Sequence, residues 1–158
     1  MRFTYSFNKD YQEAKNMKDN PKEYEGLSSV VWSNFTLIGK AKAFILGNLS
    51  ILRIYYVWLI HQKEVKNAFK KHKLKLPQVI CYIYNFGYQG WFDTDTNTIH
   101  VRFTKSPNND LAESIIHELV HLATYKKEYD YNKRETVVDR YLEKMNFSFM
   151  NFKRQKLN

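Results

Sequence analysis

The stretch HELVH, residues His117–His121, decides how the rest of this sequence is interpreted. On a helix, His117 and His121 lie one turn apart on the same face, so both imidazoles can reach one cation. Glu118 lies one step round the helix, where it can reach a water on that cation. The spacing is typical of zinc sites, and such a site needs a third protein ligand from elsewhere in the chain.

The third ligand can be sought by elimination. Every other histidine precedes the motif, so a downstream histidine is excluded. The downstream acids are Glu128, Asp130, Glu135, Asp139 and Glu143. In RETVVDRY, Glu135 and Asp139 are four residues apart on one helical face. One of the two can bind the metal, while the other accepts the free N–H of a ligand histidine.

The remaining acids leave some alternatives open. Glu128 and Asp130 lie in a polar connection between two predicted helices and are less constrained. Glu135 has a second interpretation, as an N-terminal helix cap acting together with Asn132.

HELVH followed by ETVVD, residues 135–139, resembles the gluzincin metallopeptidases, which combine His-Glu-x-x-His with a later Glu-x-x-x-Asp on a second helix. The short connection is most similar to that of the minigluzincins, over about residues 43–145. The resemblance implies that His117, His121 and Glu135 bind one Zn²⁺ per chain. It implies Glu118 as the general base and Asp139 as the partner of a ligand histidine. The expected activity is that of a zinc-dependent endopeptidase, which hydrolyses peptide bonds with metal-activated water.

The same resemblance implies a zincin-like α+β fold. A long N-terminal helix would back a small sheet with antiparallel pairing and an edge strand, followed by the active-site helix and the glutamate helix. The edge strand would bind extended peptide or protein substrate through its backbone, and its residues would be Thr98, Ile99, His100, Val101 and Arg102. Candidates for stabilising the transition state are Tyr131, Tyr125, Tyr129 and His100.

Hydrophobic periodicity and capping signals predict the individual elements. The predicted helices cover residues 40–73, 111–126 and 133–145, with Asp110 and Glu113 as a capping box before the second. Strands are predicted at residues 77–84 and 97–103, paired as a hairpin or small antiparallel sheet. DTDTNT, residues 93–98, begins like a calcium loop but lacks its glycine and its closing glutamate, which favours a hairpin turn.

The chain divides into three predicted parts: an N-terminal arm at 1–42, a catalytic domain at 43–146 and a basic C-terminal tail at 147–158. The segment FSFMNF, residues 147–152, is interpreted as a docking segment. The basic tail beyond Met145 leaves latency and self-association open as regulatory possibilities.

The apolar stretch from Ala43 to Ile60 is nearly long enough to cross a bilayer. Asn48 and Arg53 in its interior, and lysines at both ends, favour a long buried helix instead. Membrane insertion or surface attachment is the alternative.

The chain has 158 residues, a formal net charge of +9 and one cysteine, Cys81. The charge would attract nucleic acid, acidic proteins or anionic lipid, although the lysines are spread along the chain. An alternative function is therefore a nucleic-acid-associated or regulatory module with little turnover, against which the intact Glu118 argues. The lone cysteine excludes a disulfide within the chain. The N-terminus lacks the features of a secretory signal, so a cytoplasmic protein is expected.

Overall fold

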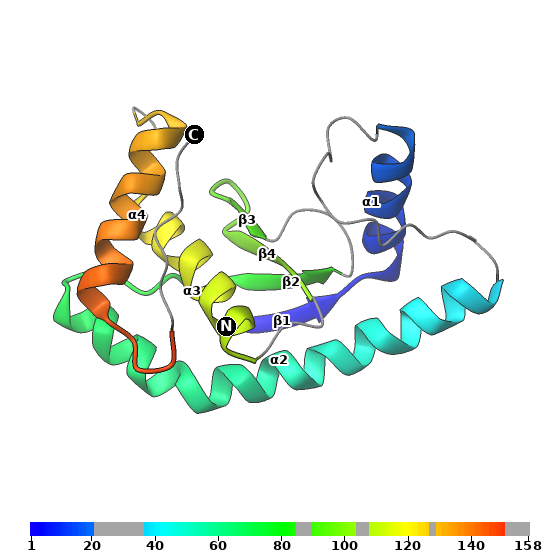
Figure 1. The fold of residues 1–158 in the computed structure, drawn as a ribbon, viewed down its shortest axis with the longest axis horizontal. Helices are drawn as coiled ribbons and strands as arrows, with labels where there is room; N and C mark the ends of the chain where they lie inside the picture. Colours follow the sequence, from blue (N-terminus) through cyan, green and yellow to red (C-terminus); the bar gives the residue numbers. More distant parts are fainter. Residues whose placement is uncertain (21–36, 85–89, 104–107, 127–128, 151–158) are drawn as a thin grey trace.

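The computed structural model describes the backbone of residues 1–20, 37–84, 90–103, 108–126 and 129–150. Within these residues the chain forms four helices and a small mixed sheet of four strands, which confirms the predicted α+β class (Figure 1). The elements are β1 (Arg2–Tyr5), α1 (Phe7–Asp19), α2 (Leu37–Lys71), β2 (Ile80–Tyr84), β3 (Gly90–Asp93), β4 (Thr98–Arg102), α3 (Asn108–Thr124) and α4 (Tyr131–Met145). In Figure 1, α2 runs beneath the sheet, and α3 and α4 lie together at one side.

The strand order is β1-β2-β4-β3. β2 and β4 are parallel, with Ile80 opposite Thr98, so their predicted antiparallel pairing is wrong. The chain between them forms an additional strand, β3, which pairs antiparallel with β4 on its outer side. β4 is therefore an interior strand, and the prediction of Thr98–Arg102 as the substrate-binding edge is also wrong. The edge on this side of the sheet is β3.

The turn between β3 and β4 confirms the predicted hairpin turn. The Asp93 carboxylate accepts hydrogen bonds from the backbone N–H groups of Asp95, at 2.8 Å, and Thr96, at 3.2 Å. Asn97 closes the turn with a φ of 55°, a conformation that asparagine tolerates better than most residues. The local hydrogen bonds of one aspartate therefore fix the place where the chain reverses.

The N-terminal segment differs from the predicted arm, because its first residues form a strand of the sheet. β1 pairs in parallel with β2, with Arg2 opposite Ile80. The Phe3 ring packs edge-on against Tyr55 and Trp58 of α2, with centroids 6.2 Å and 6.4 Å away. This apolar contact attaches the N-terminal segment to the long helix.

The sheet has two chemically different faces, because side chains alternate along each strand. One face carries Cys81, Ile99 and Val101, which join the core formed with α2 and α3. The opposite face carries an aromatic cluster of Tyr82, Tyr84, Trp91 and His100. Lys9 of α1 lies over this second face, 3.9 Å from the centroid of the Tyr82 ring.

The predicted long helix is confirmed, but its predicted burial is wrong. The inner side of α2 packs on the core through Ile54, Val65 and Phe69. Its outer side does not, because nine large apolar side chains between Phe44 and Ile60 remain 46–68% exposed. A helix that packs against a single neighbouring layer can bury only one side.

The tail after α4 docks on α2, as predicted for the FSFMNF segment. Phe147 lies in the hydrophobic core, and Phe149 stacks on His61 with ring centroids 3.7 Å apart. The Ser148 backbone N–H and hydroxyl donate to the Glu64 carboxylate at 2.9 Å and 3.1 Å. The packed part of the chain thus extends at least to Phe149, beyond the boundary predicted at residue 146, while residues 151–158 of the predicted tail lie outside the described residues.

Candidate metal centre

The motif histidines lie on α3, which is anchored on several sides. Leu119 and Val120, between the two histidines, are fully buried in the core. α3 begins at Asn108, so Asp110 lies inside the helix and not before it as predicted, and its side chain is outside the described residues. The buried side chains fix the rotation of α3 about its axis, and that rotation directs both imidazoles towards α4.

His117, His121 and Glu135 converge on one point. The two Nε2 atoms are 3.0 Å apart. His121 Nε2 lies 3.0 Å from Glu135 Oε1, and His117 Nε2 lies 3.4 Å from Glu135 Oε2. A tetrahedral zinc ion with bonds of about 2.1 Å holds its ligand atoms about 3.4 Å apart. The predicted ligand set therefore has the donor types and the spacing for one small cation.

Glu135 is buried, and its ionised carboxylate is stable there only with hydrogen-bond donors or a positive charge nearby. Its Oε2 lies 3.4 Å from His117 Nε2 and its Oε1 lies 3.0 Å from His121 Nε2. Burial raises the pKa of Glu135, but hydrogen bonds from His117 and His121 outweigh burial and lower the pKa to about 2. A buried carboxylate that stays ionised and keeps a free lone pair is suited to a cation ligand.

Asp139 follows Glu135 one turn later on α4 and is also buried. Burial lowers the pKa of His117, but the hydrogen bond that its imidazole donates to Glu135 and the negative charges of Glu118, Glu135 and Asp139 raise the pKa overall. The charge of Asp139 therefore acts on His117, and its predicted role as the partner of a ligand histidine stays a prediction.

Glu118 is 6% exposed and lies beneath strand β3. A Cβ added to Gly90 would lie 2.5 Å from Glu118 Oε1, so any other residue here would force this carboxylate to move. Burial raises the pKa of Glu118 to about 7, with the positive charge of His117 opposing and the negative charge of Glu135 adding to the rise. A carboxyl group with this pKa can both take and return a proton near neutral pH.

β3 supplies the part of the site that sequence reasoning missed. Its Phe92 ring stacks on His121, with centroids 4.8 Å apart and planes 16° from parallel. Gly90 and Phe92 are two residues apart, so both point to the α3 side of the sheet. The sequence contained a signal in the isolated glycine before WFD, since glycine in a strand often marks a close backbone approach.

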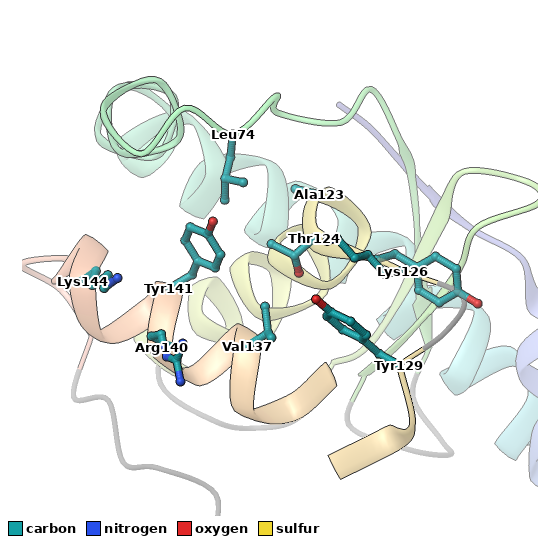
Figure 2. A pocket seen from close by; sticks show the side chains of 10 residues that line it. Leu74, Ala123, Thr124, Lys126, Tyr129, Val137, Arg140, Tyr141 and Lys144 are labelled. Carbon is teal, nitrogen blue, oxygen red and sulfur yellow. The ribbon is translucent and has the colours of Figure 1, made fainter. Parts of the chain in front are cut away.

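The three candidate tyrosines have different environments. Tyr131 is 67% exposed, but partial burial, the negative charges of Glu135 and Glu118 and a hydrogen bond with Glu135 raise the pKa of its hydroxyl. Tyr125 and Tyr129 instead line a separate cavity of about 430 Å³ between the end of α3 and α4 (Figure 2). No residue of the His117, His121 and Glu135 cluster lines this cavity.

His100 faces the other side of the sheet and is not placed as a transition-state stabiliser. Its ring stacks on Trp91 at 4.3 Å between centroids. Its Nδ1 lies 3.2 Å from the Tyr84 hydroxyl, and its Nε2 lies 3.1 Å from Thr98 Oγ1. Alternation along β4 directs it away from Ile99, which packs towards α3.

The other downstream acids have different roles or lie outside the site. Asp130 is the N-cap of α4, because its carboxylate accepts from the Lys133 N–H at 2.7 Å. The alternative of Glu135 as a cap with Asn132 is therefore wrong, since both residues lie inside α4. Glu128 lies outside the described residues, and Glu143 is exposed.

Two imidazole nitrogens and one carboxylate oxygen could thus hold a metal ion between α3 and α4. In comparisons with known proteins, no family model matches the chain, and neither a curated protein nor a solved structure matches it.

Proposed function

We propose that this chain is a zinc-dependent endopeptidase with a gluzincin-like, zincin-type site. The observation that carries the proposal is the convergence of His117, His121 and Glu135 with the buried Glu118 carboxyl alongside. Two histidines and one carboxylate are a donor set used by catalytic zinc sites that keep a fourth position open. A bound zinc ion would supply a Lewis acid there, which polarises the scissile carbonyl and lowers the pKa of water.

The chain's own residues supply the proton transfers. Glu118 Oε1 takes a proton from the attacking water and returns it to the nitrogen of the leaving amine. The environment that raises the pKa of Glu118 to about 7 supports both steps. Tyr131 is the preferred candidate for donating a hydrogen bond to the developing oxyanion, because its hydroxyl lies near the same carboxylates.

Substrate binding is assigned to β3 and not to β4. β3 forms one edge of the sheet and runs past the site, with Gly90 beside Glu118 and Phe92 beside His121. An extended peptide can add to such an edge through main-chain hydrogen bonds. Residues 85–89, which precede β3, lie outside the described residues.

Purified protein is expected to contain about one zinc per chain by elemental analysis. It should cleave members of an unbiased peptide library, and a chelator should stop cleavage. Folded protein that neither contains nor takes up zinc would refute the proposal.

Glu118→Gln should keep the zinc and lose cleavage by about 10²- to 10⁴-fold, since general-base catalysis contributes that much. Glu113→Gln removes the same charge from the same helix and should cleave like the wild type. Equal cleavage by Glu118→Gln and the wild type would exclude Glu118 as the base.

The alternative of a nucleic-acid-associated module rests on the net charge of +9. It predicts a DNA mobility shift that weakens steeply with salt, without any zinc-dependent cleavage.

A further inference from the structure

The outer side of α2 carries a continuous apolar face. We define the apolar face by Ile45, Leu49, Leu52, Tyr56, Leu59 and Ile60, each 47–68% exposed. Their spacing places them on one side of the helix. The opposite side, including Ile54 and Val57, is buried in the protein. In the described part of the chain, the helix is thus packed on one side and bare on the other.

An exposed apolar surface of this extent usually marks an interaction site. By length and composition, Phe44–Lys71 is apolar enough to cross a membrane. Crossing would expose to lipid the side that now packs on the sheet and α3. A helix that is packed on one side and apolar on the other fits an orientation parallel to a membrane surface.

The charges on α2 indicate what this face binds. Beyond Ile60 the same side of the helix continues with Lys63, Lys66 and Lys70, all exposed. Glu64 is the only acidic residue in α2. Its carboxylate accepts hydrogen bonds from Ser148, so it does not offset the lysines on the outer side. An apolar stretch followed by lysines complements acyl chains next to anionic headgroups.

A second copy of the chain complements this face less well. In an antiparallel pairing of two α2 helices, Lys63 would lie near Lys40 and Lys42 of the other copy by sequence position, and in a parallel pairing near Lys63 itself. Both arrangements place like charges together, which disfavours association.

We propose that the apolar face of α2 binds the surface of an anionic lipid bilayer, with the helix in the plane of the membrane. The inference does not depend on the proposed peptidase activity, because it rests on residues of α2 on the outside of the molecule. Zinc content and vesicle binding therefore test the two proposals separately.

The test is flotation of the full chain with vesicles of phosphatidylcholine, with or without about 30% phosphatidylglycerol. The protein should float with the anionic vesicles, and binding should weaken several-fold as salt rises from about 0.05 M to about 0.5 M. Absence of binding to the anionic vesicles would overturn the proposal.

Two variants separate the apolar contribution from the charge contribution. Leu52→Gln with Leu59→Gln changes no charge and should weaken binding at least about tenfold, since two exposed side chains lose their insertion into lipid. Lys63→Gln with Lys70→Gln should weaken binding to anionic vesicles by about tenfold to thirtyfold.

The matched control is Lys133→Gln with Lys144→Gln, which removes two exposed lysines from α4. It should change binding less than about threefold, because net charge alone contributes little away from the surface. Equal loss in the two lysine pairs would overturn the assignment to α2. A stable dimer in lipid-free sedimentation that Leu52→Gln with Leu59→Gln dissociates would assign the face to a second copy instead.

Discussion

The two faces of the sheet hold histidines in contrasting environments. On the α3 side, His117 and His121 face the buried carboxylate of Glu135. On the other side, His100 is also buried, but it lies among Tyr84, Trp91 and Thr98. Burial lowers the pKa of the His100 ring to about 4, with the positive charge of Lys9 adding to the effect and the negative charge of Asp93 opposing it. A converging carboxylate, and not burial alone, distinguishes a candidate metal site from a structural histidine.

The largest effect is expected on removing the Glu135 carboxylate, which distinguishes the surroundings of His117 and His121 from those of His100. Glu135→Ala should lower zinc affinity by at least about 10³-fold, because it removes one of the three proposed protein ligands. Glu143→Ala, on the exposed side of the same helix, is the matched control. Zinc titration against a competing chelator measures both, and wild-type affinity in Glu135→Ala would mean that another residue is the third ligand.

Gly90→Ala should affect activity without removing the metal. The added methyl group would lie 2.5 Å from Glu118 Oε1, so the carboxylate has to move by about 1 Å to reach van der Waals distance. Misplacement of that size can lower turnover by about 10²-fold. Peptide cleavage and zinc content measured on the same sample test this, and unchanged cleavage would show that Glu118 does not act from its position in the structure.

Asp139→Asn should weaken zinc binding by about 10- to 100-fold, the usual effect of losing a partner of a ligand histidine. Its charge helps to raise the pKa of His117, and the amide would not replace that charge. The competition titration used for Glu135 is the measurement, with Glu143→Gln as the isosteric control. Equal affinities for the two variants would leave Asp139 with a packing role only.

His100 should influence stability and its pH dependence but not zinc affinity. Its pKa in the folded state is lowered, so the folded state binds fewer protons than the unfolded state between about pH 4 and pH 6.5. The contribution of His100 to the free energy of unfolding is therefore fully present above pH 6.5. It falls by up to about 3 kcal/mol as the pH drops to 4. Urea unfolding at several pH values should show this loss in the wild type and a smaller loss in His100→Phe. Parallel pH profiles, or altered zinc binding in His100→Phe, would contradict the assignment.

The helices that carry the site could be predicted because their signals are local. The spacing of HELVH and ETVVD places each set of side chains on one helical face, and the structure brings the two faces together. The sheet order could not be predicted in the same way. Pairing partners such as Ile80 and Thr98 are distant in sequence, and nothing in NTIHVRF shows that two strands flank it.

The bare side of α2 was missed for a related reason. Composition predicted a long apolar helix, and apolar helices in soluble proteins are usually buried. The number of buried sides of a helix depends on how many layers pack against it. The sheet and α3 cover only one side of α2. β3 was not predicted because it has only four residues and begins with a glycine, so it shows no alternation of apolar and polar residues.

The parallel pairing of β1 with β2 has a consequence for the order of folding. Arg2 and Ile80 are paired across the intervening α1 and α2, so closing this loop costs more chain entropy than forming the β3–β4 hairpin. On a ribosome, β1 emerges before β2 and cannot pair with it until the chain beyond Ile80 has been released. The hairpin and the α3–α4 pair can form from neighbouring segments, whereas β1 is expected to join the sheet after them.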